Sequence, residues 1–353
     1  MTHFFQDNYI TLILILVLNI FIIKNNKYIN IFKIYDIPDE NRKFHKHKTP
    51  IIGGNILFLN IIFYFLFDYF FLNINDNFNL YFVHSLKTFY SFYLCLTAIF
   101  FIGLYDDKFN LKANTKIMIS CFLILSAILI DSHLVLTEIK LSFLDKTYNL
   151  GLFGYFFSIV CILTLINTLN MIDGIDLQAG LYLLYLLMIL FFLNQSLIII
   201  FLLLAILSFL YLNFLNKSFL GDSGIYFIAY IISYLLIKNY NINKNIFVDH
   251  IVIIFIIPFL DLIRTSIHRL SLGKNPFLAD NNHIHHLLMT RFKNYTFLAD
   301  LIIFLLPGLL FFFLSAINKY NIFTFSFLIL FSTCFYLFMI FRFGKKMIFS
   351  KKK

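Results

Sequence analysis

Long apolar stretches alternate with short polar segments along almost the whole chain. Each stretch is about 16 to 24 residues long, near the length that a helix needs to cross the hydrocarbon core of a bilayer. Eleven stretches are predicted as helices: 8–23, 51–72, 82–105, 113–130, 151–169, 177–193, 196–214, 224–238, 247–268, 296–316 and 322–342. The pattern predicts an all-α, polytopic integral membrane protein with about eleven transmembrane helices.

The composition supports this class and excludes a water-soluble domain. Apolar residues make up 61% of the chain and charged residues only 13%, with 49 Phe and no Trp, so a soluble surface could not be built from it. We interpret the first stretch as a retained span, because it lacks the cleavage site of a signal peptide. The four cysteines stand singly in apolar runs, which predicts neither disulfides nor a thiolate metal site. We therefore expect a single transmembrane domain over residues 1–353.

The positions of Lys and Arg predict the orientation. Cytoplasmic loops collect these residues, and 22 of the 28 lie on one of the two alternating sides. This places the N-terminus outside and the C-terminus in the cytoplasm, with cytoplasmic loops at about 24–50, 106–116, 170–176, 215–223 and 269–295. The cytoplasmic excess of basic residues explains the net charge of +10, and this excess would attract anionic lipid headgroups. Nucleic acid is therefore not an expected partner.

Five polar motifs interrupt the apolar chain, and all of them fall on the predicted cytoplasmic side. Ionisable groups near hydrocarbon are costly and usually functional, so we expect these motifs to form an active site. They are Asn41-Arg42-Lys43-Phe44-His45, Asp106-Asp107, Asn167 to Asp176, Gly221-Asp222-Ser223-Gly224 and His283-Ile284-His285-His286.

The pair Asp106-Asp107 ends the third predicted span and precedes Lys108, Lys112 and Lys116. Adjacent carboxylates do not both ionise cheaply without a counter-charge, so they imply a cation, which is either a metal or these lysines. The alternative is an ordinary solvated helix end.

Asn167, Asn170, Asp173 and Asp176 recur every three residues, so successive members would be neighbours on a helix. Their oxygens suit Mg²⁺ or Mn²⁺ rather than a soft metal. A polar helix C-terminus that leads into a turn is the alternative, but it does not explain four oxygen donors at one spacing.

Asp222 precedes the eighth predicted span, where the positive end of a helix dipole would favour a diphosphate and its metal. A Gly-Asp turn is also a common helix start. The ninth span carries Asp261, Arg264, His268 and Arg269 as one polar stripe, which we expect to face the bundle interior, with an internal Asp-Arg ion pair as the simplest explanation. For the histidine motif, phosphate contacts are favoured over zinc binding.

Taken together and in this order, the motifs resemble the polyprenyl-phosphate N-acetylhexosamine-1-phosphate transferase family over about residues 35 to 290. The matching stretches are Arg42 to His45 with Pro50 and Gly53-Gly54, Gly103 to Asp107, Asn167 to Gly180, Phe219 to Gly224, and Pro276 to Leu288. The HIHHLL ending is similar to the undecaprenyl-phosphate GlcNAc-1-phosphate branch rather than to the muramoyl-pentapeptide branch.

This resemblance implies transfer of a sugar 1-phosphate from a UDP-N-acetylhexosamine to undecaprenyl phosphate at the cytoplasmic face of the bacterial inner membrane. The implied cofactor is Mg²⁺, with Mn²⁺ as the alternative ion, and a homodimer would be unsurprising. The implied roles are lipid-phosphate positioning or deprotonation by Asp106 and Asp107 with Lys116 as counter-charge, metal ligation by Asn170 and Asp222, nucleotide binding by Asp173, Asp176 and Phe219, and diphosphate or sugar binding by Arg269, His283, His285 and His286.

The chain departs from the family pattern at four positions: Leu177 and Gln178 replace the usual Gly-Leu pair, Ile225 replaces the usual Ser, and Asn281 stands where a basic residue is common. None of these is an implied metal ligand, but the departures leave open a member with altered donor specificity or lost catalysis. Two other classes compete: a transporter, whose polar groups would lie near the midplane in repeated halves, and an alcohol phosphotransferase acting on CDP-linked donors, whose Ala-Arg pair is missing after Asp173. The sugar and the pathway served stay open.

Overall fold

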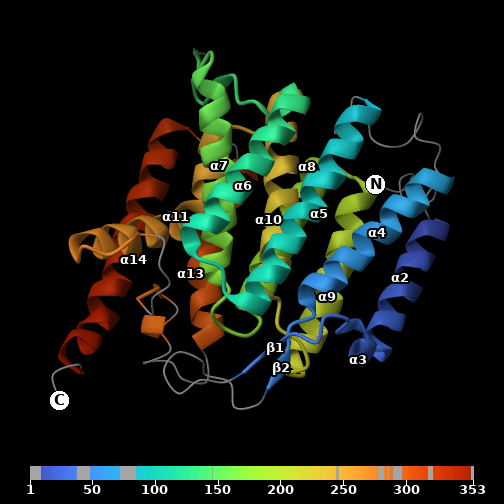
Figure 1. Cartoon of the computed structure of the whole chain (residues 1–353). Coiled ribbons are helices and arrows are strands. Elements are labelled where there is room, and N and C mark those ends of the chain that lie inside the picture. The colour runs from blue at the N-terminus through green and yellow to red at the C-terminus, as the bar shows by residue number, and fades with distance from the viewer. Residues whose placement is uncertain are drawn as a thin grey trace. The chain divides into compact units, whose positions relative to one another are not determined.

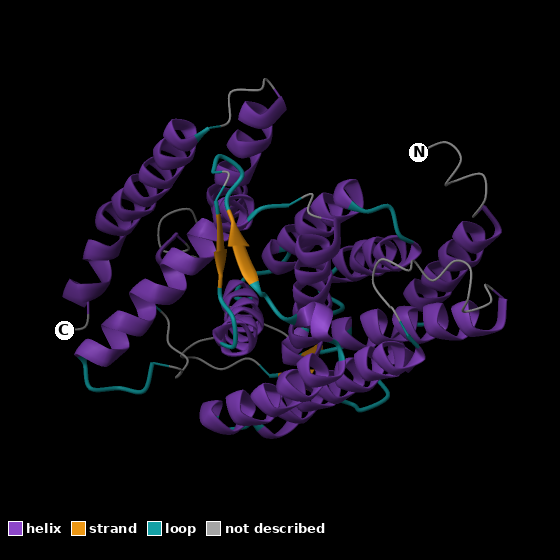
Figure 2. Cartoon of the chain, turned by 90° about the horizontal axis from the view of Figure 1, so that it is seen from above, coloured by secondary structure: helices purple, strands orange, loops and turns teal. Residues whose placement is uncertain are grey.

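The computed structural model of the chain describes residues 9–37, 48–71, 85–144, 146–243, 246–276, 282–284, 286–288, 296–316 and 321–350. Helices account for most of these residues, and strands form two short antiparallel ladders (Figures 1 and 2). The chain divides into two compact units. The first comprises Met1–Leu136, Tyr155–Ile166 and Leu183–Asn245, and the second comprises Thr137–Gly154, Asn167–Tyr182 and Ile246–Lys353. Each unit is described by itself.

Within the described residues, one apolar helix lies at each position where a span is predicted. These helices are α2 (Tyr9–Lys24), α4 (Gly53–Phe71), α5 (Leu86–Phe109), α6 (Ala113–Ile130), α7 (Phe153–Ile172), α8 (Gln178–Leu193), α9 (Leu197–Phe214), α10 (Gly221–Lys238), α11 (Val248–Ser271), α13 (Thr296–Ala316) and α14 (Ile322–Ser350). Seven of them, α5, α6, α7, α9, α10, α11 and α14, are long and apolar enough to cross a membrane. The polytopic membrane class is therefore supported, whereas eleven crossings and the orientation of the termini stay predictions.

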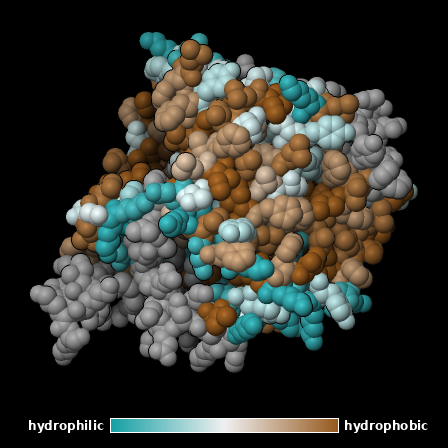
Figure 3. Space-filling view, viewed as in Figure 1, coloured by the Kyte–Doolittle hydropathy of each residue, from teal (hydrophilic) through white to brown (hydrophobic). Residues whose placement is uncertain are grey.

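The outer surfaces of the helices carry apolar side chains, which are brown in Figure 3. On α6, for example, Met118 is 72% exposed and Phe122 is 69% exposed. Large apolar side chains exposed along whole helices would be unfavourable in water, whereas lipid tails accommodate them. The exposed faces are thus those of a protein that lies within a bilayer.

In the first unit, α10 is the central helix and packs mainly against α5 and α4. Every residue from Ser223 to Lys238 is buried. Aromatic rings fill the contact: Phe58 of α4 stacks on Phe100 of α5 with ring centroids 4.1 Å apart, and Phe227 of α10 meets Phe100 edge-on. Such packing fixes α10, whose first residues carry the Gly-Asp-Ser-Gly motif, relative to the end of α5.

A buried network of side-chain hydrogen bonds joins α2, α4 and α9 of this unit. The Asn19 side-chain amide on α2 donates to Asn60 Oδ1 on α4 at 2.9 Å. The Ser208 hydroxyl on α9 donates to Asn19 Oδ1 at 2.9 Å. In lipid the hydrophobic effect does not drive helices together, so hydrogen bonds between polar side chains of neighbouring helices contribute to their association. The network holds the outer helices α2 and α9 against α4.

An ion pair lies at the opposite end of α10 from its Gly-Asp-Ser-Gly motif. Lys238 Nζ is 2.6 Å from Asp131 Oδ2, and the side chains are 0% and 2% exposed. Asp131 follows α6, accepts a hydrogen bond from the Tyr234 hydroxyl at 3.2 Å, and accepts another from the His133 backbone N–H at 3.1 Å. This carboxylate therefore ties the end of α6 to the end of α10.

Breaking this pair should destabilise the protein strongly. We expect Lys238→Met or Asp131→Asn alone to lower the free energy of unfolding by about 3–5 kcal/mol, because each leaves a buried polar partner uncompensated. The double variant should lose much less than the sum of the two. Reversible unfolding in detergent micelles measures the coupling, and additive losses would show that the two side chains do not depend on each other.

In the second unit, α11 packs against α13 and α14. A hairpin of β3 (Glu138–Lys140) and β4 (Thr147–Asn149), which the hydropathy pattern does not predict, lies beside the start of α11. Asp249 of α11 is fully buried and accepts hydrogen bonds from the Ser142 N–H at 2.9 Å and from its hydroxyl at 2.7 Å. These bonds hold the turn of the hairpin to the first turn of α11.

Candidate active site

The first-unit cluster starts at Asp106, in the last turn of α5. This carboxylate is 3% exposed, accepts a hydrogen bond from the Leu111 N–H at 2.7 Å, and forms an ion pair with Lys116 near the start of α6. Asn110, in a left-handed conformation with φ 52°, ends α5 and donates its N–H to the Asp106 carbonyl. The chain reversal between the two helices therefore brings Lys116 back to Asp106, so that one of the three lysines considered from the sequence is its partner.

Asp107 caps the start of α10. Its Oδ1 accepts the Asp222 N–H at 2.8 Å, and its Oδ2 accepts the Ser223 N–H at 3.1 Å. A carboxylate at a helix N-terminus satisfies unpaired backbone donors and is favoured by the helix dipole. The cap comes from a different helix and is 115 residues distant along the chain. It fixes the direction in which Asp222 leaves α10.

The Asp222 side chain completes the cluster. It is 30% exposed, and its Oδ2 lies 3.4 Å from Lys116 Nζ. Lys116 thus pairs with two carboxylates, and the third caps the helix that carries Asp222. Asp106 and Asp107 each accept hydrogen bonds from backbone N–H groups, whereas Asp222 is partly exposed and faces the Lys116 side chain.

Glycines on two neighbouring helices allow this close approach. A Cβ atom on Gly103 of α5 would lie 2.4 Å from Ser223 Cα, and one on Gly54 of α4 would lie 2.5 Å from Ser223 Oγ. Both distances are shorter than carbon atoms tolerate. A strand segment adds to the anchoring: β2 (Thr49–Pro50) pairs with β1 (Tyr35–Asp36), and the next residue bridges to Phe219. The start of α10 is therefore held on several sides.

The charge balance of the cluster fits a divalent cation. Three carboxylates and one ammonium group leave an excess of negative charge, and Mg²⁺ is commonly held by one or two carboxylates together with substrate phosphates. Among the described residues, no group of three His, Cys, Asp or Glu side chains forms a ready-made metal cage. The donor set thus suits a metal that arrives with a phosphate-bearing substrate.

The second predicted cluster belongs to the second unit. Asn167 and Asn170 lie in the last turns of α7, which ends at Ile172, whereas Asp173 and Asp176 follow in the turn before α8. The helical spacing therefore holds for the two asparagines and ends before the two aspartates, which are exposed. Asn170 and Asp222 fall in different units, so their pairing as metal ligands stays a prediction.

The departures at Leu177 and Gln178 have structural consequences. Leu177 has φ 68°, in the left-handed region where a side chain is strained and glycine is usual. Gln178 is fully buried, and neither polar atom of its amide has a hydrogen-bond partner among the residues that the structure describes. The backbone thus keeps the conformation for which the family pattern has glycine, even though this chain carries leucine.

We expect Leu177→Gly to stabilise the protein by about 1 kcal/mol, because glycine adopts a positive φ without a steric penalty. Thermal unfolding in detergent measures the change. Leu181, one turn further along α8, provides the matched control: Leu181→Gly should destabilise because it places glycine within a helix. A lower stability for Leu177→Gly would mean that packing of the leucine outweighs its backbone strain.

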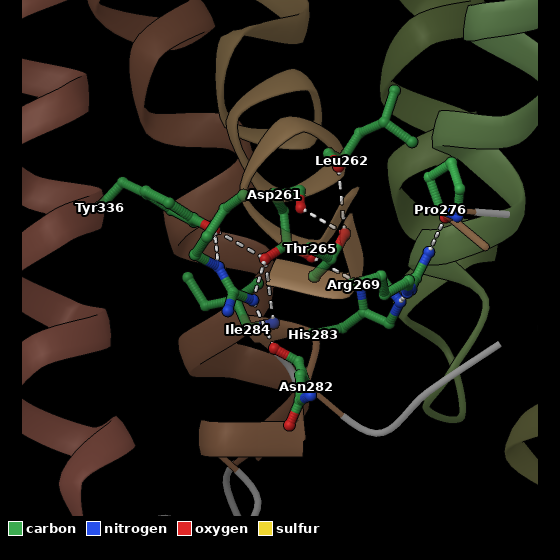
Figure 4. Close-up of polar contacts among 10 residues, drawn as sticks. Asp261, Leu262, Thr265, Arg269, Pro276, Asn282, His283, Ile284 and Tyr336 are labelled. Carbon is green, nitrogen blue, oxygen red and sulfur yellow. Dashed lines mark hydrogen bonds and ion pairs between the residues drawn. The ribbon is translucent and has the colours of Figure 1, made fainter. Parts of the chain in front are cut away.

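The third predicted cluster, also in the second unit, lies along α11 and the histidine motif (Figure 4). Asp261 is 4% exposed, Arg269 is 6% exposed and His283 is 6% exposed. His283 Nδ1 is 2.9 Å from Asp261 Oδ2, and its Nε2 is 3.1 Å from Arg269 Nη2. The interior position expected for the α11 stripe is therefore confirmed for Asp261 and Arg269, but it is wrong for His268, which is exposed.

Other predicted residues need separate mention. His286 and Phe219 are both half-buried. The motif Asn41 to His45, together with Asn281 and His285, lies outside the described residues. Tyr336 of α14 was missed: it is buried, and its hydroxyl donates to Asp261 at 2.7 Å. It stands in an apolar span beyond the residues that carry the family resemblance, so only its hydroxyl among apolar neighbours could have marked it.

Comparison with known proteins agrees with this geometry. An apolar helical protein with carboxylates and one lysine gathered at the start of a buried helix belongs to the class of membrane-embedded phosphotransferases. The glycosyl transferase family 4 profile matches residues 89–240. These residues include the whole first-unit cluster.

Three relatives extend the match. The undecaprenyl-phosphate alpha-N-acetylglucosaminyl 1-phosphate transferase of Escherichia coli (strain K12) is 30% identical over 264 residues, covering 70% of this chain and 67% of the relative. The enzyme of the same name from Salmonella typhi is 27% identical over 267 residues, with the same coverage. A probable undecaprenyl-phosphate N-acetylglucosaminyl 1-phosphate transferase of Bacillus subtilis (strain 168) is 29% identical over 262 residues, covering 70% and 68%. The chain belongs to glycosyl transferase family 4, the polyprenyl-phosphate sugar-1-phosphate transferases.

Proposed function

We propose that the chain transfers an N-acetylhexosamine 1-phosphate from a UDP-sugar to undecaprenyl phosphate, releasing UMP and forming an undecaprenyl-diphosphate sugar. The observation that carries the proposal is the cluster in which Lys116 pairs with Asp106 and Asp222, while Asp107 caps the start of α10 beside Asp222. Phosphoryl transfer needs mostly positioning and charge neutralisation and little covalent chemistry. Formation of this product would be the first membrane step in the synthesis of a cell-envelope polysaccharide or glycan.

The proposed step is a direct displacement at phosphorus. An oxygen of the lipid phosphate forms a bond to the sugar-linked phosphorus. The bond from that phosphorus to the bridging oxygen of UMP breaks, and UMP leaves with the electron pair. Lys116 supplies a positive charge beside the incoming phosphate, and Asp106 holds Lys116 in place from its buried position. Asp107 acts through its cap on α10, which aims Asp222 at the reacting groups.

Asp222 and Asn170 are the proposed ligands of Mg²⁺, with Mn²⁺ as the alternative. The ion would neutralise charge on the phosphates during transfer. The accessible Asp222 carboxylate and the excess negative charge around it support this assignment.

The donor nucleotide and its diphosphate are assigned to the second unit. We propose that Asp173, Asp176 and Phe219 bind the uridine end, although Phe219 belongs to the first unit. His285 and His286 are proposed to contact the diphosphate or the sugar. Exposure of Asp173 and Asp176 at the end of α7 is consistent with contact to a water-soluble donor.

We place the reaction at the cytoplasmic face of the bacterial inner membrane, with the N-terminus outside. The lysine and arginine asymmetry supports this orientation. Within the first unit, the carboxylate cluster and the Asp131–Lys238 pair lie at opposite ends of α10. Of these two ends, the start of α10 carries the groups that we propose for the phosphate site, Lys116 with Asp106 and Asp222.

Release of UMP by purified full-length protein tests the proposal. The protein is given undecaprenyl phosphate, Mg²⁺ and, one at a time, UDP-GlcNAc, UDP-GalNAc or a 6-deoxy UDP-N-acetylhexosamine. Release that requires both the lipid and Mg²⁺ would support the reaction, and the best donor would identify the sugar. A folded protein that releases no UMP with any donor would contradict the proposal and point to the Leu177 and Asn281 departures.

A further inference from the structure

The Asp261 carboxylate accepts hydrogen bonds from four donors. Its Oδ1 accepts from Arg264 Nη2 at 2.9 Å, from the Tyr336 hydroxyl at 2.7 Å and from the Ile284 N–H at 3.3 Å, while its Oδ2 pairs with His283 Nδ1 at 2.9 Å. Three of these donors converge on Oδ1 and one reaches Oδ2, so both oxygens are engaged with groups of the protein itself. A buried carboxylate held in this way by four donors from three segments of the chain fixes those segments to one another.

The bonds of His283 identify its tautomer. Arg269 can only donate, so the Nε2 atom that faces its guanidinium must be an acceptor. A neutral ring then carries its hydrogen on Nδ1 and donates it to Asp261. Both ring nitrogens are therefore engaged inside the protein, and Asp261 determines how the ring is oriented.

Two arginines of α11 hold backbone carbonyls on either side of the segment that precedes the histidine motif. Arg269 Nη1 donates to the Pro276 carbonyl at 2.6 Å, and Arg264 donates to the Asn282 carbonyl. Arg264 Nε also donates to the Tyr336 hydroxyl at 2.6 Å. Charged donors to carbonyls are strong hydrogen bonds. These arginines therefore hold Pro276 and Asn282 to α11, and Arg264, Asp261 and Tyr336 of α14 bond to one another.

We propose that Asp261 is a positioning residue for the donor site: through His283 and Arg264 it fixes residues 282–284, at the start of the histidine motif, against α11 and α14 without touching the substrate. This inference rests on the proposed function. It assigns His283 to support, in place of the diphosphate contact that the family resemblance implies. The contact with the donor is then left to His285 and His286.

Hydrogen–deuterium exchange of the full-length protein tests the positioning independently of catalysis. Asp261→Asn keeps the size of the side chain but replaces one acceptor oxygen with a donor. We expect exchange at the Ile284 and Leu287 amides to accelerate by at least about tenfold. The amides of Asp222 and Ser223, which Asp107 caps in the first unit, should exchange as in the wild type. His268→Gln, at an exposed position on α11, should leave both regions unchanged.

Steady-state kinetics with UDP-GlcNAc and undecaprenyl phosphate then connects positioning to the reaction. For Asp261→Asn, kcat/KM for the donor should fall about 10²-fold, as expected when a binding group is displaced by about 1 Å, while KM for the lipid stays unchanged. His283→Asn, whose amide can still donate to Asp261, should retain at least about a tenth of wild-type kcat/KM, and His283→Ala should retain less. His268→Gln serves as the control here too.

The outcomes separate the two proposals. A wild type that releases no UMP contradicts the proposed function, while faster exchange at Ile284 in Asp261→Asn would still support the positioning role. Unchanged exchange and unchanged donor KM in Asp261→Asn would overturn the inference. It would also be overturned if Asp261→Asn abolished kcat with normal exchange and a normal donor KM, because Asp261 would then act on the reacting groups directly. Tyr336→Phe removes one of the four bonds and should give a smaller acceleration in the same direction, which covers the case in which Asp261→Asn does not fold.

Discussion

Asp222→Asn is expected to lower UMP release by about 10³-fold while the protein remains folded. The amide keeps the shape of the carboxylate but removes the negative charge that we propose for metal binding. Folding should persist because Asp107 caps the backbone N–H of residue 222 rather than its side chain. The side chain is partly exposed, and asparagine has nearly the same size as aspartate, so the packing around it should be kept. The rate is measured as lipid-dependent UMP release, and folding is measured by thermal unfolding in detergent.

Glu138→Gln provides the matched control for this experiment. Glu138 lies in the β3–β4 hairpin, where it pairs with Lys140 at 2.6 Å, so the same chemical change is made away from the carboxylate cluster. We expect its UMP release to equal that of the wild type. Retention of most activity by Asp222→Asn would remove Asp222 from the metal site and leave the charge-neutralising role to Lys116.

The positions of the helices follow from hydropathy, because lipid requires every spanning segment to satisfy its own backbone. The predicted 113–130 span and the observed α6 agree at both ends, and 196–214 differs from α9 by one residue. The predicted start at 224, however, lies three residues inside α10. Hydropathy assigned Gly221 to Ser223 to a loop because they are small or polar, whereas the Asp107 cap allows the helix to start there.

The residues of the carboxylate cluster were also predictable, but their division of labour was not. Composition at a helix end marks Asp106 and Asp107 as a pair without saying that one binds Lys116 and the other caps a helix 115 residues away. Hydrogen bonds between distant helices leave no local spacing in a sequence. The same reason hides Tyr336, whose partner Asp261 is 75 residues earlier. The β3–β4 hairpin has short strands with no clear alternation of polar and apolar residues, so the hydropathy pattern does not predict it.

Lys116→Met should separate lipid binding from metal binding. Lys116 Nζ pairs with Asp106 and lies 3.4 Å from Asp222, so its removal takes away the ammonium group that neutralises these two carboxylates. The anionic lipid phosphate should bind more weakly, with KM raised by about tenfold or more, and kcat/KM should fall about 10²-fold. The Mg²⁺ concentration for half-maximal activity should move the opposite way, to lower values, because a divalent cation then meets less repulsion beside Asp222.

Lys112→Met makes the same charge change at an exposed position four residues earlier, where solvent and salt screen the charge. We expect its KM values and its Mg²⁺ dependence to stay near those of the wild type. If both lysine variants shift the lipid KM equally, a general surface charge rather than the buried Lys116 contact attracts the lipid phosphate. If Lys116→Met instead requires more Mg²⁺, the ammonium group is not competing with the metal for Asp222, and the two must bind on different sides of the carboxylates. The opposite signs expected for lipid and metal thus distinguish a counter-charge within the site from a lysine that only stabilises the fold, since a loss of stability would weaken the binding of both.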